Sequence, residues 1–495
     1  MMAPDHLDVL IVGAGLSGIG AACQLRRHRP DKTFAVLEAR DEVGGTWDLF
    51  RYPGVRSDSD MFTLGYSFAP WRAPKAIAEG ATILDYLRRT AEEYDVTRHI
   101  RLGHRVVRAD WDSRQGRWTV LVRRPDTADP ITFTCAFLYA CTGYYRYDAG
   151  HTPHFAGQDR FTGRIVHPQH WPVDLDLRDR RVVVIGSGAT AVTLVPALAR
   201  QAAEVTMLQR SPTYVLALSA RDGFADALRR RLPARLAHPL IRWKNLLGVT
   251  LTYQFSRWAP GLMRRLLRRG VARRLPAGYD VDRHFRPRYD PWDQRLCVDP
   301  DGEFFATLAE GRARVVTDTI EGFTATGIRL TSGTELPAEV VVTATGLDLL
   351  ALGGITLRVD GVEVDLAQTV AYKGMMLSGV PNFALTLGYT NASWTLKADL
   401  VAEYVCRLLR HLERTGTQVV TPSAPPDDRR APLIGLSSGY VRRGIERLPR
   451  QGHRAPWRAH QNYLRDLLLL RFGRLTDPGV RFSRVDSAPR RSVDA

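Results

Sequence analysis

The chain has 495 residues, of which 44% are apolar, and a formal net charge of +17 at pH 7. This length predicts two or more domains, and no run of 18 or more apolar residues indicates a membrane-spanning helix. The first strand begins too early to leave room for a secretory signal. Five scattered cysteines without a C-x-x-C pair argue against disulfides, a dithiol redox centre and a zinc site. We therefore expect a cytoplasmic protein without a bound metal.

The first element is an apolar strand from Val9 to Val12, followed by Gly13-x-Gly15-x-x-Gly18 and a helix of small residues. Such glycines let the backbone turn tightly and approach a pyrophosphate, at which the N-terminus of the helix points. Glu38 ends the next strand, where a carboxylate accepts hydrogen bonds from ribose hydroxyls. This unit predicts a site for FAD or NAD.

Three strand-like segments follow over residues 106–111, 118–122 and 131–133, and an apolar strand over residues 136–143 ends in Thr-Gly. We expect residues 1–145 to form the first part of an FAD-binding domain.

The same pattern returns with a strand from Val182 to Ile185, followed by Gly186-x-Gly188-x-x-Ala191 and a second helix. Here the next strand ends on Arg210, and a guanidinium there suits the 2′-phosphate of NADPH. The second unit therefore predicts an NADPH site.

A strongly basic stretch follows the second unit. Residues 221–290 contain 17 Lys and Arg against five Asp and Glu, and Leu, Trp and Met alternate with Arg at helical spacing. Three interpretations remain open: a solvated face of a helical subdomain, a patch resting on anionic lipid, and a nucleic-acid surface. The last is disfavoured because no nucleic-acid-reading module is recognisable, so we expect no nucleic-acid partner and a possible peripheral membrane contact.

A further apolar strand over residues 339–346 again ends in Thr-Gly, which predicts that the chain re-enters the first domain there. The predicted fold class is α/β, with two Rossmann-like dinucleotide-binding domains, the second inserted in the first, and a helical subdomain. The predicted domains are residues 1–145 and 339–485 for FAD, 146–338 for NADPH with a helical insertion at about 215–290, and a disordered tail at 486–495.

Between the two units stand Phe161, Gly163, His167 and Trp171, with a proline directly after the tryptophan. This spacing matches the F-x-G-x-x-x-H-x-x-x-W-P signature of the Baeyer–Villiger monooxygenases, which are class B flavoprotein monooxygenases. The resemblance covers nearly the whole chain, including GGTWD at 44–48, RYPGVRSD at 51–58 and ATG at 344–346, and it is nearest to mycobacterial members.

The resemblance implies a set of cofactor contacts. Those to FAD come from Ser17, Glu38, Thr46, Trp47, Asp48, Leu49, Asp58 and the backbone of Val106. Those to NADPH come from Arg56, Ser57, Asp58, Gly186, Ser187, Gly188, Ala189, Thr190, Ala191, Val192, Gln209 and Arg210.

The resemblance also assigns the catalytic residues. Arg295 aligns with the active-site arginine of the family, and Asp58 would hold it in place. The signature residues Phe161, Gly163, His167 and Trp171 would govern how the two domains move. Gln294 departs from the lysine that many ketone-oxidising members carry at this position.

The implied reaction is NADPH- and O₂-dependent insertion of one oxygen atom next to a ketone carbonyl, through a flavin C4a-peroxide. A permanently charged guanidinium beside the flavin would keep the peroxide anionic. The expected substrates are small hydrophobic ketones, sulfides or thioamides. The alternative is a sulfur or nitrogen oxygenase with little ketone activity; a flavin disulfide reductase would need a cysteine pair that the sequence lacks.

Overall fold

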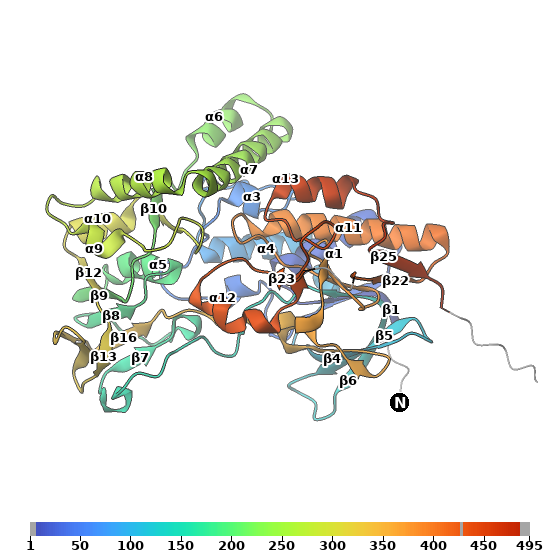
Figure 1. Cartoon of the computed structure of the whole chain (residues 1–495), viewed down its shortest axis with the longest axis horizontal. Helices are drawn as coiled ribbons and strands as arrows, with labels where there is room; N and C mark the ends of the chain where they lie inside the picture. Colours follow the sequence, from blue (N-terminus) through green and yellow to red (C-terminus); the bar gives the residue numbers. More distant parts are fainter. Residues whose placement is uncertain (1–5, 426–428, 486–495) are drawn as a thin grey trace, which may run out of the picture.

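The computed structural model describes residues 6–425 and 429–485. Two β-sheets lie at opposite ends of the long axis, and helices cover the upper side of both (Figure 1). The predicted disordered tail at 486–495 lies outside the described residues.

The larger sheet contains both ends of the predicted FAD-binding unit. Its strand order is β18-β17-β4-β5-β6-β1-β2-β3, and β21 also pairs with β6. The central strands β1, β2, β6 and β21 run parallel, whereas β4, β5 and β6 form an antiparallel meander. The strands are β1 (His6–Val12), β2 (Phe34–Leu37), β3 (Ile100–Arg101), β4 (Arg105–Asp112), β5 (Arg117–Arg123), β6 (Ile131–Ala140), β17 (Thr356–Val359), β18 (Val362–Glu363) and β21 (Phe383–Leu385).

The second sheet is entirely parallel, with the order β12-β9-β8-β16-β7. Its strands are β7 (Arg164–Val166), β8 (Arg181–Ile185), β9 (Glu204–Gln209), β12 (Ala313–Thr317) and β16 (Val340–Thr343). All five come from the middle of the chain, between the two segments that build the larger sheet. The second unit is therefore inserted in the first.

One expectation from the sequence was wrong. The strand within residues 339–346 was predicted to re-enter the first domain, but β16 pairs with β7 and β8 in the second sheet. The Thr-Gly ending is a feature of the local sequence and says nothing about the neighbouring strands, whereas the partners of a strand depend on which strands of a sheet are still unpaired beside it. The division into domains otherwise stays a prediction, with this strand moved to the second unit.

Two separate cores hold the helices against these sheets. In the first, buried residues of β1 pack with α1 (Leu16–His28), α4 (Gly80–Glu93) and α11 (Trp394–Thr415). In the second, β8 and β9 pack with α5 (Ala189–Leu198) and α10 (Glu303–Ala309). Because the strands of each βαβ unit are buried on both faces over most of their length, their central residues are mostly apolar and do not alternate with polar ones.

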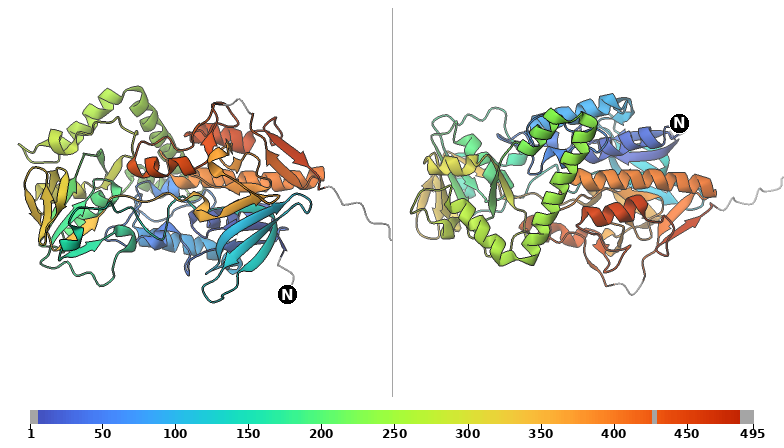
Figure 2. Two further views of the ribbon diagram at one scale, coloured as in Figure 1. Left: turned by 60° about the horizontal axis from the view of Figure 1, so that its bottom comes forward. Right: turned by 90° about the horizontal axis from the view of Figure 1, so that it is seen from above.

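The basic stretch forms four helices, α6 (Gly223–Arg231), α7 (Ala234–Trp258), α8 (Pro260–Ala272) and α9 (Val281–Phe285). Arg242 of α7 donates to the carbonyl oxygens of Phe62 and Gly65 in the first unit. Met263 and Leu267 of α8 pack instead against Tyr214 and Leu296 in the second unit. The helices thus bridge the two units, as the view from above shows (Figure 2).

The remaining elements are short. They are α2 (Thr46–Leu49), α3 (Met61–Leu64), α12 (Gly439–Gly444), α13 (Tyr463–Asp466) and the strands β10 (Val215–Leu218), β11 (Cys297–Pro300), β13 (Ile320–Phe323), β14 (Gly327–Leu330), β15 (Glu335–Pro337), β19 (Ala371–Tyr372), β20 (Met376–Leu377), β22 (Val419–Pro422), β23 (Ala431–Pro432), β24 (Arg450–Gln451) and β25 (Val480–Ser483). Within residues 6–425 and 429–485, no helix is both long and apolar enough to span a membrane.

Candidate active site

The first glycine turn joins β1 to α1. Gly13 has φ of +102°, and a Cβ there would lie 2.7 Å from the carbonyl oxygen of Cys141. A Cβ on Gly18 would lie 1.7 Å from the Gly13 oxygen. Gly15 is the N-cap of α1 and makes no side-chain cap, and Ser17 follows within the first turn. The N-terminal amides of α1 therefore carry no competing side-chain cap, which fits the pyrophosphate of a dinucleotide.

Glu38 lies at the end of β2, beside this turn, and is 6% exposed. Its two carboxylate oxygens accept hydrogen bonds from the amides of Ala14 (2.7 Å) and Arg40 (3.0 Å). Burial raises the pKa of Glu38. Each carboxylate oxygen has a further lone pair, so ribose hydroxyls could still donate to it and offset the loss of hydration.

The predicted FAD residues Thr46, Trp47, Asp48 and Leu49 make up α2. Its N-cap Gly45 lies against the first turn, because a Cβ there would be 3.1 Å from Cα of Gly15. Asp48 is buried and forms ion pairs with Arg40 and Arg51. The structure thus brings α2 to the start of α1, whereas Val106, on β4, is buried among apolar residues.

The second glycine turn joins β8 to α5. Gly186 has φ of +134°, and a Cβ there would lie 2.3 Å from the carbonyl oxygen of Ala344. Gly188 caps α5 without a side-chain bond, and a Cβ there would meet nothing within 4 Å. Gly188 and Ala189 are exposed, Thr190 is half-buried, and Ala191 and Val192 are buried against the sheet. The exposed start of α5 fits a second pyrophosphate.

The two residues expected at the 2′-phosphate differ in their surroundings. The Arg210 side chain is exposed at the end of β9 and forms no hydrogen bond or ion pair with any described residue. Gln209 is 2% exposed, and its Nε2 donates to the His284 carbonyl oxygen and to Thr317 Oγ1, both at 2.8 Å. Arg210 is therefore the better candidate, because the Gln209 amide nitrogen is already engaged.

Arg295 and Asp58 meet although they are 237 residues apart in the chain. Nη2 of Arg295 lies 3.2 Å from Oδ1 of Asp58, and each side chain is about one-third exposed, 34% and 33%. The Asp58 carboxylate, with smaller contributions from Tyr144, Tyr145 and Tyr440, raises the pKa of Arg295. The guanidinium is thus positively charged at any physiological pH.

The loop that carries Asp58 connects the two units. Gly54 approaches α5 closely, because a Cβ there would lie 3.0 Å from the carbonyl oxygen of Thr193. Arg56 donates to the carbonyl oxygen of Val298 at 3.0 Å, and the Ser57 hydroxyl accepts the amide of Ala78. Asp58 and Arg295 therefore stand where the first unit meets the second.

The signature segment ties together the two crossings between the units. These crossings pair with each other: Arg146 N donates to Asp348 O, and Leu350 N to Tyr144 O. The ring of His167 accepts the Gln169 amide at Nδ1 and contacts the Gly346 carbonyl oxygen from Nε2 at 3.2 Å.

This bonding describes a neutral imidazole with its proton on Nε2, and burial lowers the pKa of His167 accordingly. Phe161 is buried in the core beneath β16, and a Cβ on Gly163 would lie 2.4 Å from the Glu339 carbonyl oxygen. Trp171 packs against the core of the second sheet.

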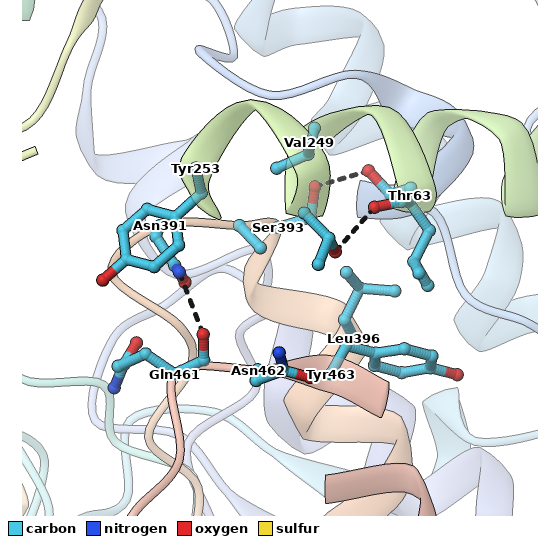
Figure 3. Close-up of a pocket in the computed structure, with 12 residues that line it drawn as sticks. Thr63, Val249, Tyr253, Asn391, Ser393, Leu396, Gln461, Asn462 and Tyr463 are labelled. Carbon is cyan, nitrogen blue, oxygen red and sulfur yellow. Dashed lines mark hydrogen bonds between the residues drawn. The ribbon is translucent and has the colours of Figure 1, made fainter. Parts of the chain in front are cut away.

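A pocket lies between α7, the start of α11 and the segment before α13 (Figure 3). Its cavity volume is about 20 Å³, which is room for about one water molecule. Thr63 and Ser393 share a hydrogen bond of 2.7 Å at its side, and Asn391 donates to the Gln461 carbonyl oxygen. The lining residues are Thr63, Leu246, Val249, Thr250, Tyr253, Asn391, Ala392, Ser393, Leu396, Gln461, Asn462 and Tyr463.

The pocket is connected to both parts of the predicted site. Tyr253 packs edge-on against Trp292, three residues before Arg295. Ser393 precedes Trp394, whose indole nitrogen donates to Ser17 Oγ at 2.8 Å and whose ring lies 5.2 Å from that of Tyr144. The pocket is therefore linked to the first glycine turn through Trp394 and to the Arg295 segment through Tyr253.

Comparison with known proteins agrees with this geometry. Residues 7–258 match the family model described as flavin-binding monooxygenase-like. The chain is 54% identical over 482 residues to the FAD-containing monooxygenase EthA of Mycobacterium tuberculosis, covering 97% of this chain and 98% of that protein. It is 51% identical to EthA of Mycolicibacterium smegmatis, covering 98% of each. The chain belongs to the flavin-binding monooxygenase family.

Solved structures resemble this family member in fold. Oxidised steroid monooxygenase bound to NADP gives a TM-score of 0.73 at 23% identity, covering 97% of this chain and all of the other (100%). The open structure of cyclohexanone monooxygenase gives 0.70 at 21% identity, covering 85% and 90%. The predicted fold class and the predicted enzyme class, a flavoprotein monooxygenase, are confirmed.

Two tryptophans of this flavin-binding monooxygenase were not predicted as site residues. Trp292 has φ of +72°, and its buried Nε1 has no hydrogen-bond partner among the described residues. A bulky residue in this region of φ costs about 1–3 kcal/mol and tends to occur at functional sites. Trp394 links Ser17 to Tyr144. Neither backbone strain nor a contact between distant segments can be read from residue order.

Proposed function

We propose that this monooxygenase uses NADPH and O₂ to insert one oxygen atom next to the carbonyl of a ketone, giving an ester. The observation that carries the proposal is the Arg295–Asp58 pair, which lies where the two dinucleotide units meet. A fixed cation at this point is what oxygen insertion requires and what hydride transfer alone does not.

The two glycine turns support FAD at the first unit and NADPH at the second. EthA is named for its FAD, and the solved structure of OTEMO, which has a TM-score of 0.70 at 24% identity and covers 85% of this chain, contains FAD and NADP. When bound, reduced flavin supplies the electrons that split O₂ and passes one oxygen atom to the substrate, the other leaving as water. Ser17 and Glu38 would bind the FAD, and Arg210 the 2′-phosphate of NADPH.

Arg295 would stabilise the negative charge that develops on oxygen during the transfer. Its charge is permanent, and the Asp58 carboxylate limits the directions in which the guanidinium can point. A preorganised donor of this kind contributes about 3–4 kcal/mol to the stability of a transition state. Asp58 is thus a positioning residue for Arg295.

The pocket between α7 and α11 would bind the substrate. Its walls combine Leu246, Val249 and Leu396 with a few polar groups, which matches the chemistry of a small hydrophobic ketone, sulfide or thioamide. Because the cavity has room for about one water molecule, these side chains would have to move apart when such a substrate binds. We further propose that His167 and Trp171, with Phe161 and Gly163, set the relative position of the two units, because His167 bonds to the returning crossing.

The test is a substrate panel supplied with NADPH and ¹⁸O₂, scored by mass spectrometry for labelled ester and labelled sulfoxide. The expected result is an ester carrying one ¹⁸O atom. If sulfides are oxidised while every ketone is left unchanged, the protein is a heteroatom oxygenase and the ketone assignment fails.

A further inference from the structure

The outer face of the helical insertion exposes much apolar surface. Among the described residues, fifteen large apolar side chains are exposed, and nine of them lie between Phe224 and Leu266. Six of these follow one another along α7, which is 25 residues long: Leu236, Leu240, Trp243, Leu247, Leu251 and Trp258. Steps of three, four and seven residues keep these side chains on one side of a helix. Contiguous exposed apolar surface of this kind usually marks a docking site.

The C-terminal segment extends this surface. The helical turn after α13 exposes Leu468 and Phe472, which are 64% and 69% accessible. Tyr463, at the start of α13, packs edge-on against Trp243 of α7, with ring centroids 6.3 Å apart. Figure 1 and the view from above in Figure 2 both place α13 beside α7. We define the docking face as the exposed apolar residues of α7 and α8 together with Leu468 and Phe472.

Positive charge accompanies the docking face. Six exposed arginines on α6 to α8 and in the turn just after α8 have no ion-pair partner among the described residues: Arg230, Arg231, Arg235, Arg265, Arg269 and Arg273. A second copy of this chain would bring the same cations against one another, so the charge disfavours a homodimer here. Nucleic acid would neutralise the arginines but leave the leucines and tryptophans in water.

We propose that the docking face binds the surface of an anionic phospholipid bilayer. Leucine and tryptophan side chains would enter the boundary between headgroups and acyl chains, and the arginines would contact lipid phosphates. The helices lie on the surface of the bilayer and do not cross it.

The pocket lies on the inner side of α7, whose outer side carries the docking face. Leu246, Val249 and Tyr253 line the pocket from α7, one or two positions away from the exposed Leu247 and Leu251. Tyr463 lines it from the start of α13. A hydrophobic substrate dissolved in the bilayer would therefore reach the pocket between α7 and α13 without passing through water. This step rests on the proposed function, which makes the pocket the substrate site.

The first experiment measures binding without substrate. Purified holoenzyme is sedimented with vesicles of phosphatidylcholine alone, or with about one-third phosphatidylglycerol, at low and high salt. We expect binding to the anionic vesicles that high salt weakens. The double variant Leu247→Glu/Leu251→Glu should bind at least about tenfold more weakly, because two apolar side chains no longer leave water. Leu468→Glu/Phe472→Glu should also weaken binding if the face is composite.

The matched control is Val362→Glu on β18, an apolar side chain that is exposed to 70%, similar to the 67% of Leu251, and lies outside the docking face. It should bind like the wild type. All variants keep their flavin absorbance and unfolding temperature if they fold normally. Absence of vesicle binding by the wild type, or equal binding by the α7 double variant, overturns the proposal. So does a dimer in analytical ultracentrifugation that the α7 double variant dissociates, since a second copy then covers the face.

The second experiment compares a water-soluble ketone with a long-chain ketone dissolved in anionic vesicles. The α7 double variant should oxidise the soluble ketone at the wild-type rate and the vesicle-dissolved ketone several-fold more slowly. Equal rates on both refute delivery through the docking face. Failure of every variant and the wild type on both ketones, with vesicle binding intact, counts against the proposed ketone oxidation and leaves the membrane contact standing.

Discussion

Replacing Arg295 by alanine separates a structural role of this residue from a catalytic one. The ion pair with Asp58 spans 3.2 Å, and both side chains are about one-third exposed. Water screens a pair of this exposure, so its loss should lower the free energy of unfolding by only about 0.2–1 kcal/mol. Removing a preorganised donor from the reacting oxygen should instead raise the activation barrier by about 3–4 kcal/mol, or roughly 100- to 1,000-fold in rate.

The assay follows three quantities in the same protein. Flavin reduction by NADPH, measured anaerobically by absorbance, should continue, because Arg295 is not proposed to act in hydride transfer. Ester formation, measured by gas chromatography, should fall by the factor above. The midpoint of urea unfolding should change little. If Arg295 has only a structural role, ester formation should change little and the midpoint of urea unfolding should fall.

Arg257→Ala is the matched control. Arg257 pairs with Asp293, two residues before Arg295, at 2.7 Å and with 47% and 36% side-chain exposure. Its loss removes a similar exposed ion pair from the same segment without removing the proposed donor. Ester formation by Arg295→Ala at a rate close to that of Arg257→Ala would refute the reasoning.

Three further predictions concern the second unit and the hinge. In steady-state kinetics, Arg210→Ala should raise the KM for NADPH about 10- to 100-fold and leave the KM for NADH nearly unchanged. Gln209→Ala should instead lower the unfolding temperature measured by calorimetry. Equal KM changes for both nucleotides in Arg210→Ala would contradict the role of Arg210. Gly186→Ala should lower the free energy of unfolding by about 1–3 kcal/mol, because Gly186 has φ of +134° and a Cβ there would meet backbone. Gly188→Ala should unfold like the wild type. Similar urea midpoints for the two variants would contradict a special backbone requirement at Gly186. Burial holds the pKa of His167 below its ordinary 6.5, so the free energy of unfolding should fall as the pH drops below about 6.5 and the ring becomes protonated. His167→Asn should therefore lose less stability than the wild type between pH 7 and pH 5. Parallel pH profiles of the free energy of unfolding for the two proteins would contradict this.

The two turns illustrate how far local sequence reaches. Gly13 and Gly186 have positive φ, and each begins a tight turn in which a Cβ would strike backbone. Glu38 and Arg210 stand at the ends of β2 and β9 as their spacing predicted. These features were predictable because strand, turn and helix are consecutive, so a few neighbouring residues define them.

The meeting of Arg295 with Asp58 was reached only through resemblance to a family, because nothing in either local sequence refers to the other. The commitment of Gln209 to buried hydrogen bonds could not be foreseen either, since it depends on His284 and Thr317 from elsewhere in the chain. The positive φ of Trp292 likewise cannot be read from its neighbours in the sequence.

By itself, the sequence determined the two βαβ units, the opposite charges of Glu38 and Arg210 at the ends of their second strands, and the insertion of one unit in the other. Tertiary structure alone decided that β16 lies within the second sheet, that α7 and α8 together bridge the two units, and that α13 packs against α7 through Tyr463 and Trp243. The physical reason is the range of the interactions. Backbone turns and helical periodicity are fixed by neighbours along the chain, whereas sheet partners and composite surfaces depend on which distant segments are brought together when the cores are buried.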